Sequence, residues 1–237
     1  MGTSWIIAKR ELGAYFKSPV AYVVLSLFLI ISGGLFFFGN FFIAGNATMD
    51  GFFGVMPLLL VFICPAIAMR LIAEERGSGS IELLLTMPVR DSEVVFGKYL
   101  AALMVLAVGL LLTLPFALTV AKLGPLDSGP VLGSYLGTLL LGGTYLAIGL
   151  LGSAMTKNQV VAVIVGWAIC MALWLMGFLS SAAGPVLGPV LQYASPAYQF
   201  SKIARGVIEL RNVVYYLSAI GVCLVIAIQV LESRKWR

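Results

Sequence analysis

Six long apolar runs are the feature that most constrains what this chain can fold into. They cover roughly residues 20–42, 53–73, 99–121, 131–154, 160–182 and 213–231. A helix needs about 20 consecutive apolar residues to cross the hydrocarbon core of a bilayer. A membrane barrel would show short alternating segments instead. We therefore expect an all-α polytopic membrane protein with six transmembrane helices in a single domain, residues 1–237.

The composition argues against a soluble protein and against catalysis by this chain. Hydrophobic residues make up 61% of the sequence and charged residues 11%, with a mean hydropathy of +1.05. Histidine is absent, and all three cysteines lie inside apolar runs, where small core residues are expected rather than disulfides or zinc ligands. The stretch Gly77-Ser-Gly-Ser80 lacks the lysine of a phosphate-binding loop. We expect no metal and no cofactor in the chain, and an intramembrane enzyme is the weakest hypothesis.

The distribution of basic residues predicts the orientation. With the N-terminus in the cytoplasm, 11 of the 15 Lys and Arg residues fall on the inner side and four, Lys122, Lys202, Arg205 and Arg211, on the outer side. Both termini are then cytoplasmic. Anionic lipid headgroups account for the net charge of +5, so no nucleic-acid partner is expected.

Residues 1–19 are too polar to span the bilayer and read as an amphipathic helix lying in the headgroups until Pro19. The predicted apolar face consists of Trp5, Ala8, Leu12, Tyr15 and Phe16. The opposite side carries Lys9, Arg10, Glu11 and Lys17. A solvated tail that happens to be periodic is the alternative.

The break between the second and third runs holds most of the polar chemistry. Arg70–Lys98 carries nine of the 25 charged residues. Within it, Ser80–Met87 is predicted to form a short helix with an apolar face of Ile81, Leu84 and Leu85. Asp91 or Ser92 is expected to cap the next helix. An apolar face in a charged loop is typical of a segment that docks into a partner's groove. The alternative is that these leucines re-enter the headgroup region.

Residues 184–212 form an apolar stretch that Pro185, Pro189 and Pro196 divide into pieces too short to cross the bilayer. A helix over Ala197–Leu210 is predicted, with Arg205 and Glu209 close enough in sequence to pair. We expect a half-inserted helical hairpin on the outer leaflet, covered by protein or water. An amphipathic helix lying flat outside is the alternative.

Small residues recur every four positions in the fourth and fifth runs, at Ser134, Thr138 and Gly142 and at Ala162, Gly166 and Cys170. Such spacing lets helix backbones approach closely in lipid. Contacts within one subunit and a dimer seam explain it equally well. The short connection Met155–Gln159 predicts that these two helices are antiparallel neighbours.

Several of these segments resemble the membrane permease subunit of type-2 ATP-binding-cassette exporters, most closely the gliding-motility (Gld) type permeases. The resemblance rests on Phe16-Lys-Ser-Pro-Val-Ala-Tyr22, on Glu74-Glu-Arg-Gly-Ser-Gly-Ser-Ile-Glu-Leu-Leu-Leu-Thr-Met-Pro-Val89, on Val95-Phe-Gly-Lys-Tyr-Leu100 and on Ala204-Arg-Gly-Val-Ile-Glu-Leu-Arg-Asn-Val-Val-Tyr215. It covers essentially the whole chain in order. The last of these segments suggests the Gld-like branch.

The resemblance implies roles for three segments. Residues 1–19 would be an elbow helix with the interfacial residues Trp5, Leu12, Tyr15 and Phe16. Residues 74–98 would contain the coupling helix, whose ATPase-facing residues would be Glu74, Glu75, Arg76, Ser80, Ile81, Glu82, Leu84, Leu85 and Met87. Residues 184–212 would be an external re-entrant segment marked by Pro189, Tyr193, Pro196, Phe200, Arg205, Gly206 and Glu209.

The resemblance also implies a cytoplasmic ATPase that holds ATP and Mg²⁺, a second permease in a homodimer or heterodimer, and in Gld-like systems a larger accessory membrane subunit. The expected location is the bacterial cytoplasmic (inner) membrane. We expect a permease that couples ATP hydrolysis to export. The alternative is a mechanical or scaffold subunit of an envelope or gliding-motility complex that conducts no substrate.

Overall fold

The computed structural model describes residues 2–43, 48–79, 90–124, 127–207 and 209–233. Every regular element in these ranges is a helix. Six helical stretches are long and apolar enough to cross a membrane: Pro19–Gly39, Asp50–Gly77, Asp91–Leu123, Ser128–Met155, Gln159–Leu179 and Leu210–Glu232. The predicted all-α class and number of spans are confirmed for the described residues.

Several of the spans consist of two helical pieces. The first is α2 (Pro19–Gly34) continuing into the π-helix η1 (Leu35–Ile43), and it follows α1 (Thr3–Lys17). The second is α3 (Asp50–Ala68) with α4 (Arg70–Gly77), and the third is α6 (Asp91–Leu112) with α7 (Leu114–Leu123). The last three are α8 (Ser128–Met155), α9 (Gln159–Leu179) and α12 (Leu210–Glu232), with α10 (Gly184–Ala194) and α11 (Pro196–Ile203) between α9 and α12.

Prolines and polar caps set many of the helix ends. Pro19 begins α2 directly after Ser18, whose hydroxyl accepts a hydrogen bond from the Val20 N–H. Asn158 caps α9 in the same way through a 2.9 Å bond from the Val160 N–H. Pro196 begins α11, because a residue without an N–H loses nothing at the first helical position.

Helix α8 forms the centre of the bundle, with α3, α9 and α12 packed around it. Its glycines allow this close packing. A Cβ at Gly149 would lie 2.8 Å from the Ala68 Cβ, and one at Gly152 would lie 3.2 Å from the Gly166 nitrogen. The predicted neighbouring of the fourth and fifth spans is confirmed, and contacts within the chain bury Ala162, Gly166 and Cys170.

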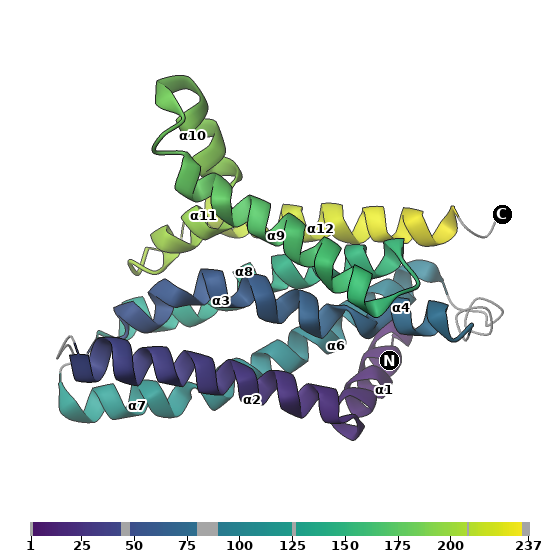
Figure 1. Cartoon of the computed structure of the whole chain (residues 1–237), viewed down its shortest axis with the longest axis horizontal. Coiled ribbons are helices and arrows are strands. Elements are labelled where there is room, and N and C mark those ends of the chain that lie inside the picture. Colours follow the sequence, from purple (N-terminus) through teal and green to yellow (C-terminus); the bar gives the residue numbers. More distant parts are fainter. Residues whose placement is uncertain (1, 44–47, 80–89, 125–126, 208, 234–237) are drawn as a thin grey trace.

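The two ends of the bundle differ (Figure 1). Helix α1, helix α4 and the last turns of α12 lie at one end, and α7 and α11 lie towards the other. Helix α10 projects beyond the rest of the bundle from the end of α9. The helices α9 and α12 are the least covered spans and leave much of their apolar surface exposed.

Two predicted boundaries are wrong. Helix α11 ends at Ile203 rather than at Leu210, because Gly206 has a φ of 85°, in the left-handed region that ends a helix. Arg205 and Glu209 therefore do not share a helical face, and no ion pair joins them among the described residues. At α6 the cap is Arg90, whose N–H donates to the Glu93 carboxylate at 3.2 Å, instead of Asp91 or Ser92.

Candidate functional site at the junction of α1, α4 and α6

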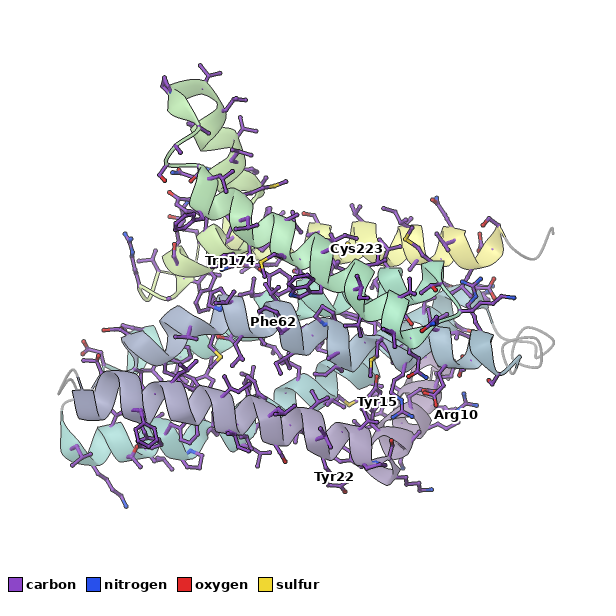
Figure 2. The ribbon with its side chains drawn as sticks, in the orientation of Figure 1. Arg10, Tyr15, Tyr22, Phe62, Trp174 and Cys223 are labelled. Atoms are coloured by element: carbon purple, nitrogen blue, oxygen red, sulfur yellow. The ribbon has the colours of Figure 1, made fainter. Side chains whose placement is uncertain are left out.

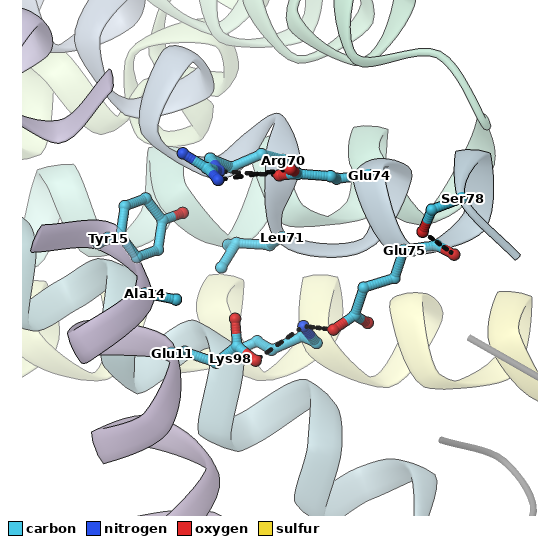
Figure 3. A pocket seen from close by; sticks show the side chains of 9 residues that line it. All are labelled: Glu11, Ala14, Tyr15, Arg70, Leu71, Glu74, Glu75, Ser78 and Lys98. Carbon is cyan, nitrogen blue, oxygen red and sulfur yellow. Dashed lines mark hydrogen bonds and ion pairs between the residues drawn. The ribbon is translucent and has the colours of Figure 1, made fainter. Parts of the chain in front are cut away.

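Three helices meet around a polar cavity at the α4 end of the bundle (Figure 3). The cavity has a volume of about 320 Å³ and lies where α1 and α6 approach α4. Its lining comprises Glu11, Ala14, Tyr15, Arg70, Leu71, Glu74, Glu75, Ser78 and Lys98. Figure 2 shows Tyr15 and Arg10 at this end of the bundle and Trp174 towards the other. We name this region the charged junction.

A hydrogen bond and a close backbone contact help to dock helix α1 on the bundle. The Tyr15 hydroxyl donates to the Ile67 carbonyl oxygen in the last turn of α3 at 2.7 Å. Burial raises the pKa of this phenol well above its ordinary value, and the positive charge of Arg70 opposes that rise only in part. The phenol therefore stays protonated and able to donate. Gly97 of α6 lets α1 approach so closely that a Cβ there would lie 2.8 Å from the Ser4 carbonyl oxygen.

Lys98 is the most buried charge of the junction, with only 1% of its side chain exposed. Its Nζ lies 2.7 Å from a carboxylate oxygen of Glu75 in α4 and 3.4 Å from one of Glu11 in α1. A buried cation is strongly destabilising unless it is paired and hydrogen-bonded. Three helices thus contribute to one buried ionic cluster.

Arg70 holds the other side of α4. Its guanidinium pairs with Glu74 at 2.9 Å, one helical turn further on, and donates to the Ser18 hydroxyl at 2.8 Å. It also lies 5.6 Å from the centre of the Tyr15 ring, which is a cation–π distance. Arg70 therefore links α4 to the joint between α1 and α2.

Helix α4 is tied to α8 as well. The Ser153 hydroxyl accepts from the N–H groups of Ile72 and Ala73 and donates to the Met69 carbonyl at 2.8 Å. These backbone groups flank the break between α3 and α4, where the helix supplies fewer partners of its own. The Arg76 guanidinium donates to the Ala154 carbonyl. A Cβ at Gly77 would meet the Lys157 carbonyl oxygen at 3.0 Å, so α4 also packs against the turn after α8.

The structure brings together part of the predicted coupling set. Glu74, Glu75 and Arg76 lie in α4, and all three have polar partners. The remaining predicted residues, Ser80, Ile81, Glu82, Leu84, Leu85 and Met87, lie outside the described residues. The described part of the segment is thus a short helical stem fixed on several sides.

The predicted apolar face of α1 divides into a protein-facing and an exposed part. Tyr15 is buried, and Leu12 and Phe16 are half-buried against the core. Trp5 is 48% exposed. Glu11 had been assigned to the solvated side, but its pairing with Lys98 places it at the protein contact. Much of α1 therefore packs on protein, and Trp5 remains for contact outside the chain.

The predicted external residues cluster less closely. Phe200 is buried, and a Cβ at Gly137 of α8 would lie 3.2 Å from its ring. Pro196 is also buried, whereas Pro189, Tyr193, Arg205 and Glu209 are exposed. A Cβ at Gly206 would lie 3.3 Å from the Pro130 side chain. Arg205 lines a second cavity of about 340 Å³ together with Asp50, Trp174 and Phe200.

Sequence reasoning missed Lys98, Gly97 and Ser153 as parts of this site. The sequence analysis places Lys98 among the cytoplasmic charges and in a segment that carries the resemblance, but gives it no partner, although it stands seven residues after the start of a helix that continues as a span. A lysine that deep in an apolar helix is the available signal, because such a charge needs a partner. Gly97 lies in the resemblance segment Val95–Leu100 without an assigned role, and Ser153 carries no distinguishing pattern.

The described residues of the junction offer ion pairs and hydrogen bonds. No group of three or more His, Cys, Asp or Glu residues that could hold a metal occurs in the part of the chain that the structure describes. The arrangement can fix the relative positions of helices and connect them to the segment that follows α4.

The described residues form a helical bundle with six candidate membrane spans, and the sequence comparisons assign its family. Residues 5–231 match the profile of the ABC-2 family transporter proteins, so the chain belongs to this family. The chain is also 31% identical over 165 residues to the "Probable ABC transporter permease protein NosY" of Pseudomonas aeruginosa. That match covers 62% of this chain and 58% of the relative, less than two thirds of its length.

Proposed function

We propose that this chain is the membrane permease subunit of an ATP-binding-cassette exporter in the bacterial cytoplasmic membrane, with both termini inside. The observation that carries the proposal is the family match over residues 5–231. The fixed stem α4, at the entrance to the segment expected to contact an ATPase, supports it. The NosY relative, named a probable permease, supports the same assignment.

In this proposal a separate ATPase subunit binds on the cytoplasmic side and supplies ATP hydrolysis with Mg²⁺. Its contact is the segment 74–98, in which residues 80–89 follow the stem. Movement of that segment would be passed to the second span through α4 and to the third through α6. A ligand or partner shifts such an equilibrium only if it binds the two conformations with different affinity, so the ATPase must contact the stem differently with and without nucleotide.

A second permease completes the proposed complex, either another copy of this chain or a related subunit. The exposed apolar surfaces of α9 and α12 leave room for protein or lipid contacts. The external segment 184–212 is proposed to enter the outer leaflet, with α11 packed on α8. A larger Gld-like accessory subunit would be recovered together with the complex if it exists.

The test is purification of the tagged chain from its host membranes, followed by identification of bound proteins. We expect an ATPase, and we expect Leu84→Asp to abolish its binding without preventing membrane insertion, because an unpaired charge in an apolar contact costs several kcal/mol. Leu123→Asp is the matched control, since this exposed leucine is the last residue of α7, a helix towards the other end of the bundle (Figure 1). If the Leu84→Asp variant still binds the ATPase, the leucines of Ser80–Met87 contact the lipid headgroups instead.

Reconstitution in liposomes separates transport from a mechanical role. An exporter should show ATP-dependent movement of a compound that also stimulates ATP hydrolysis. Stimulation by a protein partner alone, without movement of any compound, would favour the mechanical subunit.

A further inference from the structure

The ionic cluster around Lys98 extends beyond its two carboxylate partners. The Arg10 guanidinium lies 3.1 Å from the same Glu11 carboxylate oxygen that Lys98 contacts. Charges of alternating sign therefore run from the exposed Arg10 through Glu11 and Lys98 to Glu75. Figure 3 shows the inner part of this chain crossing from α1 over α6 to α4.

The three helices that this cluster joins occupy different positions in the sequence relative to residues 80–89. Helix α4 leads into the segment 80–89, and α6 leaves it. Helix α1 belongs to neither side by sequence, yet it packs along the start of α6 at Gly97 and reaches α4 through Lys98. The cluster thus connects the helix before residues 80–89, which we call the coupling segment, with the helix after it and with the N-terminal helix.

Stability alone does not account for a buried lysine here. Replacing a buried ion pair by well-packed apolar residues is often neutral or stabilising, whereas removing one partner is strongly destabilising. The charge-assisted hydrogen bond from Lys98 to Glu75, at 2.7 Å, requires a short N–O distance and a defined direction, whereas apolar burial is non-directional. The ionic cluster therefore favours one arrangement of α1, α4 and α6 over nearby arrangements with the same apolar burial.

We propose that Lys98 is a positioning residue that locks α1 and α4 onto α6, so that the three helices move as one rigid unit with the coupling segment. The inference rests on the proposed function, because it assigns to α1 a share in transmitting the ATPase's motion. Under the alternative, α1 lies in the lipid headgroups without a fixed contact to α4, and its position relative to α4 changes during the ATP hydrolysis cycle.

Spin-label distance measurements in nanodiscs test the lock directly. In a background without Cys64, Cys170 and Cys223, labels are placed at Ile6→Cys on α1 and Ser78→Cys after α4, two exposed positions. The parent should give one narrow distance distribution that is the same without nucleotide and with ATP and the ATPase present. A parent distance that changes with nucleotide would overturn the proposal.

Two variants assign the effect to the ionic cluster. Lys98→Met should increase the width of the distance distribution at least twofold. Lys9→Met, which removes an exposed charge of α1, should leave that width unchanged. Because Lys98→Met leaves two half-buried carboxylates without their cation, the triple variant Lys98→Met, Glu11→Gln and Glu75→Gln removes all three charges together. It should insert normally and still broaden the distribution. A narrow distribution in the triple variant would mean that packing at Gly97 alone sets the arrangement.

ATP hydrolysis gives a second measurement. The triple variant should bind the ATPase as the parent does but reduce permease-dependent hydrolysis at least fivefold, and wild-type hydrolysis would contradict the lock. If the parent binds no ATPase, the proposed function fails. The distance measurement on the permease alone still tests the role of Lys98.

Discussion

The Tyr15 hydroxyl donates a 2.7 Å hydrogen bond to the Ile67 carbonyl oxygen, 52 residues further along the chain. Ile67 lies in the last turn of α3, where backbone carbonyls lack partners within the helix. The N-terminal helix therefore satisfies a carbonyl at the break in the second span, so that α1 is joined to α3 through this carbonyl and to α4 through charge.

Removal of this hydroxyl should lower stability without removing the ring. Tyr15→Phe is expected to cost about 1 kcal/mol, because the Ile67 carbonyl loses a buried partner while the packing is kept. Tyr22→Phe is the control, since Tyr22 is 56% exposed. The measurement is the apparent melting temperature in detergent, which should fall for Tyr15→Phe only. Equal effects would contradict the structural role of the bond.

Ser153 should matter more than its size suggests. Ser153→Ala leaves the N–H groups of Ile72 and Ala73 and the Met69 carbonyl without their hydroxyl partner, and we expect a loss of about 2 kcal/mol. Ser218→Ala is the matched control, because that exposed hydroxyl bonds only within its own helix. Comparable melting temperatures for the two variants would show that water replaces Ser153 at no cost.

The close approach of α1 to α6 predicts that a methyl group is not tolerated at Gly97. Gly97→Ala should destabilise by about 1–3 kcal/mol through overpacking against Ser4 and Ile7. Gly221→Ala in α12 has open space around the new Cβ and should be neutral or stabilise by up to about 1 kcal/mol. Thermal unfolding measures whether the two substitutions change the stability in opposite directions. A stable Gly97→Ala protein would mean that α1 moves away freely.

Gly206 tests the end of α11. Gly206→Ala should cost about 1–2 kcal/mol, because its φ of 85° is unfavourable for a residue with a Cβ. Gly206→Asn should cost less, since asparagine tolerates this conformation better. If alanine and asparagine are equivalent, the contact with Pro130 rather than the backbone conformation decides the cost. Thermal unfolding again gives the comparison.

The proposed orientation predicts which cysteines react from outside intact cells. Asp127→Cys and Ser201→Cys should be labelled by an impermeant maleimide, and Ser78→Cys and Asn158→Cys should not. All are placed in a background without native cysteines, at described positions that are not buried. Gln199 is unsuitable, because it is only 1% exposed. External labelling at Ser78 would reverse the orientation.

The sequence by itself determined the helical class, the six spans and the neighbouring of α8 and α9. These follow from run length and loop length, which act locally along the chain. The resemblance also named Glu74 and Glu75 as ATPase-facing residues, which stays a prediction. Tertiary structure decided which residues meet: Lys98 with Glu11 and Glu75, and Tyr15 with Ile67.

The physical reason is that pairing depends on distance in space and not on residue type. A glutamate on the polar side of α1 is indistinguishable in sequence from a solvated one until α6 lies against it. Gly206 shows the same limit at the other end of the bundle. The sequence permitted a continuous helix to Leu210, and the left-handed turn packed on Pro130 ended it at Ile203 instead.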